Sequence, residues 1–305
     1  MTKELKNRFS WSTTRDSVFQ DCLRQYYFNY YGFWGGWRGD ASARIREIYV
    51  LKQLQTRQMW AGEKVHLCIE RSLNNLHRGV ALLCSDEAVD ITLRTMRSDF
   101  RFSRSKQYWQ TPKGCALIEH EYEMSISDTE WKAVANHVRE CLKAFYASEL
   151  WEQLKAMSMK DWLEVEEFSR FLLYDVTVFV KLDCCFRSKD HVVILDWKTG
   201  KSQRRNAHAL QLVCYTLYAC ARWGKDPSQI EARECKLPGM EIVQHSVEQG
   251  EIEDAKAYIR GSMTDMRSLL KDKEENEPME EAAFTTTEDD KHCRSCNFRK
   301  VCPKW

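Results

Sequence analysis

The feature that most constrains the fold is a change of hydrophobic period near residue 165. Before it, residues 42–77 and 131–159 contain no proline, and their apolar side chains recur near helical spacing, so we predict helices there. From Val165 to Trp197 the chain is rich in β-branched and aromatic residues. This composition predicts strands, with an antiparallel hairpin whose turn is Arg187–Asp190. The chain therefore combines a mainly helical N-terminal region with a sheet.

The sequence after the hairpin predicts further elements of both kinds. They are an apolar helix that ends at Gly224, two short strands and a last helix, over residues 207–223, 230–236, 241–246 and 251–270. Residues 271–281 are charged and nearly free of apolar side chains, so we expect an exposed linker there. We divide the chain into a helical region over 1–160, a core over 161–272, and a linker with a C-terminal cysteine module over 273–305. The order of elements predicts an α/β fold.

Composition limits the class of protein. The chain has 305 residues, of which 43% are hydrophobic, so it can bury a core. It has no run of about 18 apolar residues, and residues 1–12 lack the apolar stretch of a secretory signal. We therefore expect a cytoplasmic protein without a membrane partner. Thirteen cysteines in such a chain more often stay reduced than form disulfides, and we interpret the nine scattered ones, such as Cys84 and Cys141, as buried small hydrophobic residues.

The distribution of charge bears on nucleic-acid binding. A net charge of +1 gives no overall attraction to nucleic acid, so contacts with phosphates must come from local patches. Arg94, Arg97, Arg101 and Arg104 recur at steps of 3, 4 and 3, which would place them along one face of a helix. This stripe is either a solvated helix face or a phosphate-binding surface.

Two carboxylates and a lysine are expected at one end of the hairpin. Asp183 lies on one strand, and Asp196 and Lys198 lie on the next. Side chains alternate along a strand, so Asp196 and Lys198 share a face while Trp197 points to the other. Two carboxylates that converge repel each other unless a cation lies between them, and oxygen ligands suit Mg²⁺ or Mn²⁺. Such an ion with an adjacent lysine supports phosphodiester hydrolysis, although this spacing alone favours an ordinary hairpin with a surface salt bridge.

The order of these residues resembles a known family. Asp183, then Asp196 and Lys198, are similar to the signature of the RecB/Cas4-like branch of the PD-(D/E)XK nuclease superfamily. The resemblance continues on the next helix with Gln211 and Tyr215, which are four residues apart. It implies a restriction-endonuclease-like core, in which helices flank a central mixed sheet. It also implies that the two aspartates and the lysine are catalytic and that Gln211 and Tyr215 help to hold DNA.

The same resemblance assigns further residues. Residues 62–66, Gly-Glu-Lys-Val-His, are similar to a G-x-x-V-H segment whose histidine can join the metal site, whereas a lone helical histidine is usually structural. The expected metal ligands are then His66, Asp183, Asp196 and Trp197. An imidazole ligand shifts the expected preference from Mg²⁺ toward Mn²⁺. Glu166 is a further candidate acidic contact, and Lys201 and Arg204, in a basic patch after the triplet, are expected to contact the substrate.

The cysteines at the two ends of the chain form a second motif. Cys293, Cys296 and Cys302 are clustered, and three thiolates need a fourth ligand to complete a metal site. The segment around Cys22, Phe-Gln-Asp-Cys-Leu-Arg-Gln-Tyr-Tyr, resembles the F-x-x-C-P-x-x-Y-Y segment of iron–sulfur nucleases in the Cas4 and AddB group. The resemblance implies a C-terminal iron–sulfur module in which these four cysteines hold a [4Fe–4S] cluster. Zinc is the alternative, because four thiolates suit it equally well.

These observations predict a metal-dependent DNA nuclease that acts on single strands or duplex ends, an exonuclease rather than an endonuclease. Its setting would be DNA repair, recombination, or anti-phage or CRISPR-linked DNA processing, and protein partners stay open. The alternative is a catalytically idle nuclease fold that serves as a DNA-binding or scaffolding subunit. An ATP-driven helicase is excluded, because Leu195 stands where the first glycine of a phosphate loop ending in Gly200 should be. A thiol redox protein would use Cys293 and Cys296, but no βαβ pattern surrounds that pair.

Overall fold

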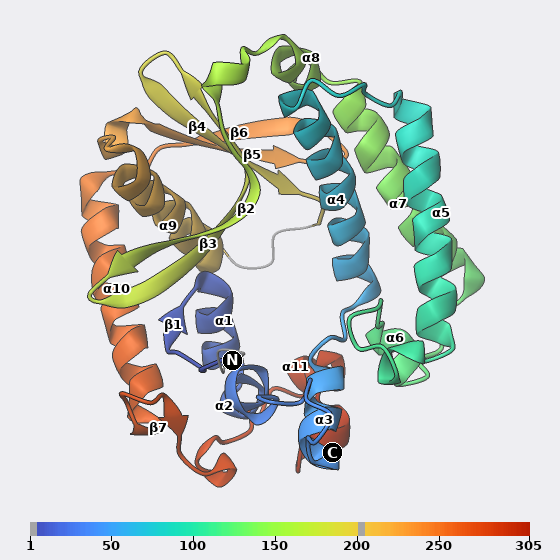
Figure 1. Cartoon of the computed structure of the whole chain (residues 1–305), viewed down its shortest axis with the longest axis vertical. Coiled ribbons are helices and arrows are strands. Elements are labelled where there is room, and N and C mark those ends of the chain that lie inside the picture. The colour runs from blue at the N-terminus through green and yellow to red at the C-terminus, as the bar shows by residue number, and fades with distance from the viewer. Residues whose placement is uncertain (1–4, 201–204) are drawn as a thin grey trace.

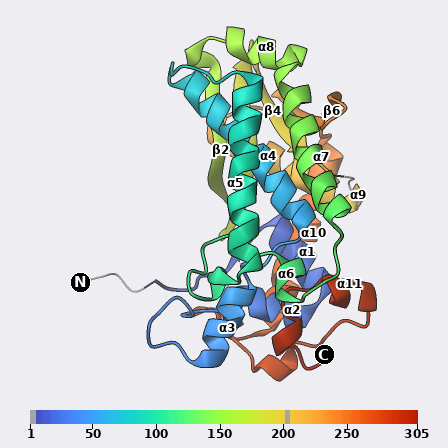
Figure 2. The ribbon, with the colours of Figure 1, turned by 90° about the vertical axis from the view of Figure 1, so that its right-hand side faces the viewer.

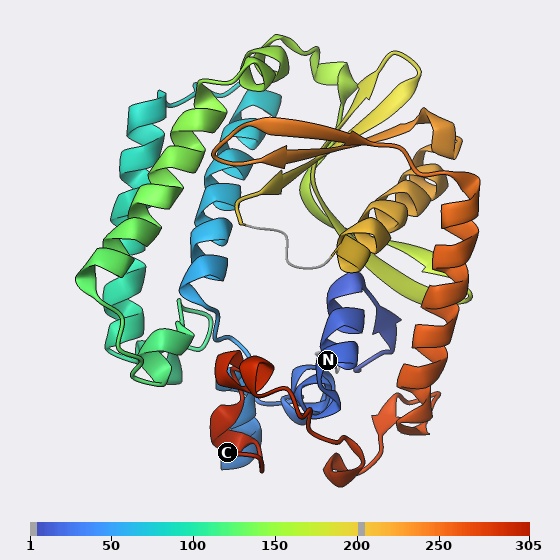
Figure 3. The same ribbon diagram turned by 180° about the vertical axis from the view of Figure 1, so that it is seen from behind.

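A six-stranded mixed sheet forms the centre of the computed structural model, which describes residues 5–200 and 205–305 (Figures 1 and 3). Its strands are β1 (Ser10–Trp11), β2 (Trp162–Leu173), β3 (Val176–Ser188), β4 (His191–Lys198), β5 (Ile230–Lys236) and β6 (Glu241–His245). The order is β1-β3-β4-β5-β6, and β2 pairs with β3. The pairs β1–β3 and β4–β5 are parallel, and the other pairs are antiparallel. The predicted α/β class, a mixed sheet flanked by helices, is confirmed.

Helices cover the sheet from both sides (Figure 1). On one side lie α4 (Arg57–His77), α5 (Ser85–Arg104), α7 (Asp128–Tyr146) and α8 (Glu149–Ala156). On the other side lie α1 (Thr13–Asp21), α9 (Arg205–Trp223) and α10 (Gln249–Ser268). The shorter helices are α2 (Leu23–Tyr27), α3 (Ala43–Leu51), α6 (Ile118–Glu121) and α11 (Asp290–Ser295). None of the helices in the described ranges is both long and apolar enough to cross a membrane.

The period of the apolar residues explains why α4 forms and which face it buries. Val65, Ile69 and Leu73, at intervals of four residues, are completely buried against the sheet and the neighbouring helices. The helix begins where the Thr56 hydroxyl accepts a hydrogen bond from the Met59 amide, which satisfies one otherwise unpaired N–H group. This packing fixes the position of the helix that carries His66.

Two hydrophobic cores lie on opposite faces of the sheet, because successive residues of a strand point in opposite directions. On the α4 side, Trp197 is 2% exposed and its ring lies edge-to-face against Phe145 of α7, with centroids 5.4 Å apart. On the α9 side, Ile194 packs with Tyr215 of α9 and Ile259 of α10. The strand β4 is therefore held by both cores.

Three expectations about local structure need correction. The hairpin turn is only Lys189-Asp190, because β3 continues to Ser188 and Lys189 adopts a positive φ of 55°. Most of residues 271–280 are exposed, as expected, but they do not form an unstructured linker, because they contain the short strands β7 (Leu270–Asp272) and β8 (Glu277–Pro278). Asn276 at their turn is buried and accepts a hydrogen bond from the Tyr31 hydroxyl. Cys84 is exposed rather than buried, because it caps the start of α5.

The N-terminal and C-terminal segments lie side by side (Figures 1 and 3). The Arg24 guanidinium lies 2.7 Å from the Glu281 carboxylate. The side-chain amide of Asn297 donates to the carbonyl oxygen of Leu51 at 2.9 Å, and the ring of Phe298 packs on Phe28 with centroids 5.2 Å apart. Residues far apart in the sequence thus form one small core.

Candidate active site

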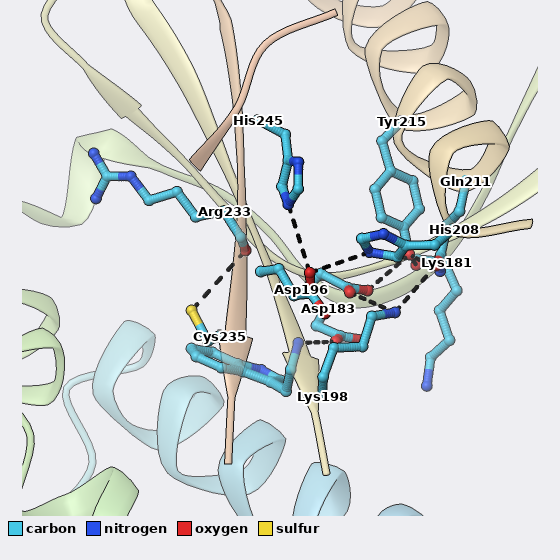
Figure 4. Close-up of polar contacts among 12 residues, drawn as sticks. Lys181, Asp183, Asp196, Lys198, His208, Gln211, Tyr215, Arg233, Cys235 and His245 are labelled. Carbon is cyan, nitrogen blue, oxygen red and sulfur yellow. Dashed lines mark hydrogen bonds and ion pairs between the residues drawn. The ribbon is translucent and has the colours of Figure 1, made fainter. Parts of the chain in front are cut away.

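Asp183 and Asp196 lie on neighbouring strands at one end of the β3–β4 hairpin (Figure 4). They follow directly beyond the ladder pair Cys184–Leu195. Both are buried, with 6% and 4% of their surface exposed. The amide nitrogen of Trp197 donates to Asp183 Oδ2 at 2.7 Å, so the backbone of β4 holds the carboxylate of β3 in place.

Lys198 connects the carboxylates to α9. Its Nζ lies 2.6 Å from Asp196 Oδ2 and donates to Gln211 Oε1 at 3.1 Å. Gln211 Nε2 donates to the Tyr215 hydroxyl at 2.6 Å, and this hydroxyl lies 3.2 Å from Asp196 Oδ1. Burial, followed by the charges of Asp196 and Asp183, raises the pKa of Tyr215 well above its usual range, so this hydroxyl remains a donor. The structure thus brings the five residues predicted from the signature together.

A histidine and a second acidic residue approach Asp183 from the other side. His66 Nδ1, on α4, lies 3.4 Å from Asp183 Oδ1 and 3.3 Å from Glu166 Oε1 on β2. Ligand atoms of these three residues all lie within 4.8 Å of one another. Lys181 Nζ lies 2.5 Å from the other oxygen of Glu166. Glu166, which the sequence analysis proposed only as a further acidic contact, therefore lies directly beside His66 and Asp183.

The electrostatics of this group favour a cation. Burial alone would lower the pKa of His66, but the carboxylates of Asp183 and Glu166 raise it to about 10. Burial raises the pKa of Asp183, and the charges of Asp196 and Glu166 add to this effect while His66 opposes it. Without a metal, a protonated His66 offsets part of the negative charge. A divalent ion in place of the His66 proton would offset the carboxylate charge in the same way.

Other predicted residues have different positions. Asp196 lies outside the compact group, because its carboxylate pairs with Lys198 and Tyr215. The side chain of Trp197 points into the core on the α4 side, and its carbonyl oxygen lies 3.1 Å from His66 Nε2. Lys201 and Arg204 lie outside the described residues.

Sequence reasoning missed a group beside Asp196. Glu234 of β5 is the ladder partner of Asp196 in parallel register and is 5% exposed. Its Oε2 lies 3.6 Å from His208 Nε2 and 3.5 Å from His245 Nε2 (Figure 4). Strand register brings Glu234 and His245 to the site, whereas His208 lies on α9, three residues before Gln211, and this helical spacing was a signal that the sequence carried.

The four terminal cysteines line a single cavity. Cys22 lies between α1 and α2, whereas Cys293, Cys296 and Cys302 lie in or directly after the last two short helices. All four are free thiols, and the Phe298 amide donates to Cys296 Sγ at 3.4 Å. Burial, and then the nearby sulfurs, raises the pKa of Cys296 to about 12. The Cys296 thiol therefore stays protonated unless a cation binds beside it and favours the thiolate.

The chain belongs to the PD-(D/E)XK nuclease superfamily, because the model of that family matches residues 10–303. A comparison with curated proteins gave no match. Two solved structures are similar. One is of a proposed exonuclease from Eubacterium rectale, with 10% identity, a TM-score of 0.31, and coverage of 65% of this chain and 78% of that chain. The other is of SSO0001, with 14% identity, a TM-score of 0.30, and coverage of 61% and 78%.

Proposed function

We propose that the chain is a metal-dependent deoxyribonuclease that hydrolyses phosphodiester bonds. The observation that carries this proposal is the placement of Lys198 and Asp196 directly beside the His66, Glu166 and Asp183 group. Membership of a nuclease superfamily supports the same reaction. A catalytically idle DNA-binding subunit is the alternative, and it would have no need of a lysine paired with a buried carboxylate at this position.

The donor atoms of the proposed metal site fit a divalent cation. His66, Glu166 and Asp183 supply one imidazole nitrogen and carboxylate oxygens within 4.8 Å of one another. Asp196 and the carbonyl oxygen of Trp197 are further proposed ligands. Mixed nitrogen and oxygen ligands suit Mn²⁺ better than Mg²⁺. When bound, the ion would activate water and polarise a phosphate oxygen.

The chain's own side chains supply the remaining chemistry. The ammonium of Lys198 provides positive charge where negative charge develops on the phosphate. Gln211, which accepts a hydrogen bond from Lys198 Nζ, and Tyr215, which is bonded to Gln211, are positioning residues that keep this ammonium beside Asp196. Lys201 and Arg204 stay proposed contacts to the DNA backbone.

Purified protein incubated with end-labelled DNA should release labelled products with Mn²⁺ and none with EDTA. We expect cleavage of linear single strands or duplex ends and no cleavage of circular DNA, because the resemblance to the RecB/Cas4-like branch favours an exonuclease. Asp183→Asn protein serves as the blank for contaminating nucleases. DNA binding without cleavage under every metal condition would favour the idle alternative. The same resemblance supports a role in repair, recombination or defence against foreign DNA.

Replacing His66 by glutamine should weaken Mn²⁺ binding at least about tenfold, because loss of even an indirect partner of a metal costs that much. Calorimetric titration of the metal-free protein with Mn²⁺ alone measures this effect without any substrate. His77→Gln is the matched control, since His77 ends the same helix and is exposed. Equal Mn²⁺ affinity of the His66→Gln and parent proteins would remove His66 from the metal site.

We also propose that Cys22, Cys293, Cys296 and Cys302 hold a [4Fe–4S] cluster, with Zn²⁺ as the alternative. The four free thiols around one cavity fit either group. The resemblance of the segment around Cys22 to iron–sulfur nucleases favours the cluster. Its role would be structural, because it would connect the two ends of the chain.

A further inference from the structure

Helices α5 and α7 lie in front of α4 in Figure 2. A groove of about 410 Å³ is lined by residues of these three helices. Leu93 and Met96 of α5 and Trp60 of α4 give it an apolar floor. Phe100 of α5 and Trp131 of α7 also line it, with their rings edge-to-face and 4.9 Å between centroids. Both of these aromatic side chains are partly exposed, so the groove offers aromatic surface to a ligand.

The sides of the groove are basic. Arg97, Arg101 and Arg104 come from α5, and Lys132 and Arg139 come from α7. Within the described part of the chain, no aspartate or glutamate lines the groove. Five cations therefore surround a partly apolar surface without a compensating anion, and a polyanion with apolar faces is complementary to it.

Only three of the four arginines in the stripe on α5 line the groove. Arg94 is exposed on the same helix but does not line the groove. Positive charge near the groove also affects His120. Burial, and then the charges of Arg104 and Lys106, lower the pKa of His120 to about 4. All four arginines of the stripe are exposed, and three of them, Arg97, Arg101 and Arg104, line the groove.

A second cavity lies where α4 and α7 meet the end of β4. It has a volume of about 560 Å³ and is lined by Thr199, which directly follows Lys198, by His137 of α7 and by Arg57 at the start of α4. The Arg57 guanidinium lies 6.0 Å from the ring centroid of Trp131 in the groove. Arg57, whose guanidinium pairs with Glu130 of the same cavity at 3.0 Å, therefore links the lining of this cavity to the Trp131 ring in the groove.

We propose that this groove binds the single-stranded DNA that extends from the active site. Stacking on aromatic side chains requires base faces that are free, and a basic groove that follows the phosphates supplies the remaining affinity. A double helix hides its base faces and would meet only the basic rim. The inference deepens the proposed nuclease function and rests on it for the choice of DNA as the polyanion.

The test measures binding of a fluorescent 30-nucleotide single strand by anisotropy in EDTA, so that no cleavage occurs. Arg101→Glu should weaken binding at least about fivefold, whereas Arg94→Glu, the same change outside the groove, should have less than about a twofold effect. Reversing Arg97, Arg101 and Arg104 together should reduce the slope of log Kd against log salt by about two, at roughly 0.7 for each phosphate contact. Binding of a blunt duplex should change less than binding of the single strand.

Equal effects of Arg94→Glu and Arg101→Glu, or an unchanged salt slope, would overturn the groove assignment. So would a larger loss for duplex than for single-stranded DNA, which would indicate a rim contact only. The result is separable from the nuclease proposal. If the parent cuts DNA and the triple variant binds like the parent, only the groove assignment fails. If no metal supports cleavage but the triple variant loses affinity, only the nuclease proposal fails.

Discussion

Replacing Lys198 by alanine should lower the rate of DNA cleavage about a hundred- to a thousandfold, with DNA binding little changed. The reason is that Lys198 Nζ, 2.6 Å from Asp196 Oδ2, supplies positive charge that acts mainly in the transition state, and groups of this kind contribute about two to three orders of magnitude. Asp183→Asn should be at least as severe, because it removes a charge from the proposed metal site. Initial rates on end-labelled DNA, with anisotropy for binding, measure both effects.

Lys236 provides the matched control for Lys198. It is the ladder partner of Lys198 on β5, and its ammonium pairs with Glu241 rather than with the catalytic carboxylates. Lys236→Ala should change the rate by less than about threefold, as expected for an exposed ion pair. Cleavage by Lys198→Ala protein at the parent rate would show that the assignment of the active site is wrong.

Replacing Cys22 by serine should remove the proposed cluster and lower the free energy of unfolding by several kcal/mol. A link between the two ends of the chain restricts the unfolded chain strongly, and for a loop of about 100 residues the comparable effect is already close to 5 kcal/mol. Anaerobically purified parent protein should be brown and contain iron and acid-labile sulfide, whereas the variant should be colourless. Visible absorption, metal analysis and thermal denaturation give independent measurements.

Cys84→Ser is the control for this experiment, because Cys84 is exposed and lies outside the cavity. It should keep the colour and the unfolding midpoint of the parent. A colourless parent that contains zinc would select the zinc alternative. A metal-free parent that folds normally, and whose stability does not change in Cys22→Ser, would remove the link between the ends while leaving the nuclease site unaffected.

Local patterns in the sequence predicted much of the fold. The helical spacing of the apolar residues in α4 and the alternation of side chains around Asp196 can be recognised without tertiary information. The same is true of the end of α9, where Gly224 adopts a positive φ. The polar composition of residues 271–281 correctly predicted that most of them are exposed, but it did not predict the β7–β8 pairing or the burial of Asn276, which contacts Tyr31 from the other end of the chain. Polarity alone could not predict that contact.

The candidate site also combines residues that local spacing predicts with residues whose position depends on strand pairing. Lys198 and Gln211 follow from short spacings within one strand and one helix, and the structure brings them together. Glu166 and Glu234 depend on how β2 and β5 pair with the hairpin, and a shift of one residue would turn either side chain away. Glu166 was therefore only a further candidate in the sequence and Glu234 was not found, because pairing register is set by the packing of the whole sheet.

The contact between the two ends of the chain also constrains the order of assembly. Cys22 and Cys293 line one cavity although roughly 270 residues separate them, and contacts between such distant residues form slowly because a long loop must close first. The N-terminal segment also supplies β1 to the sheet, so the sheet is completed only when this segment is in place. During synthesis, β1 can pair with β3 as soon as residues 176–188 have been made, whereas the contacts of the N-terminal segment with residues 293–302 can form only later. The small core between the two ends of the chain is therefore completed last.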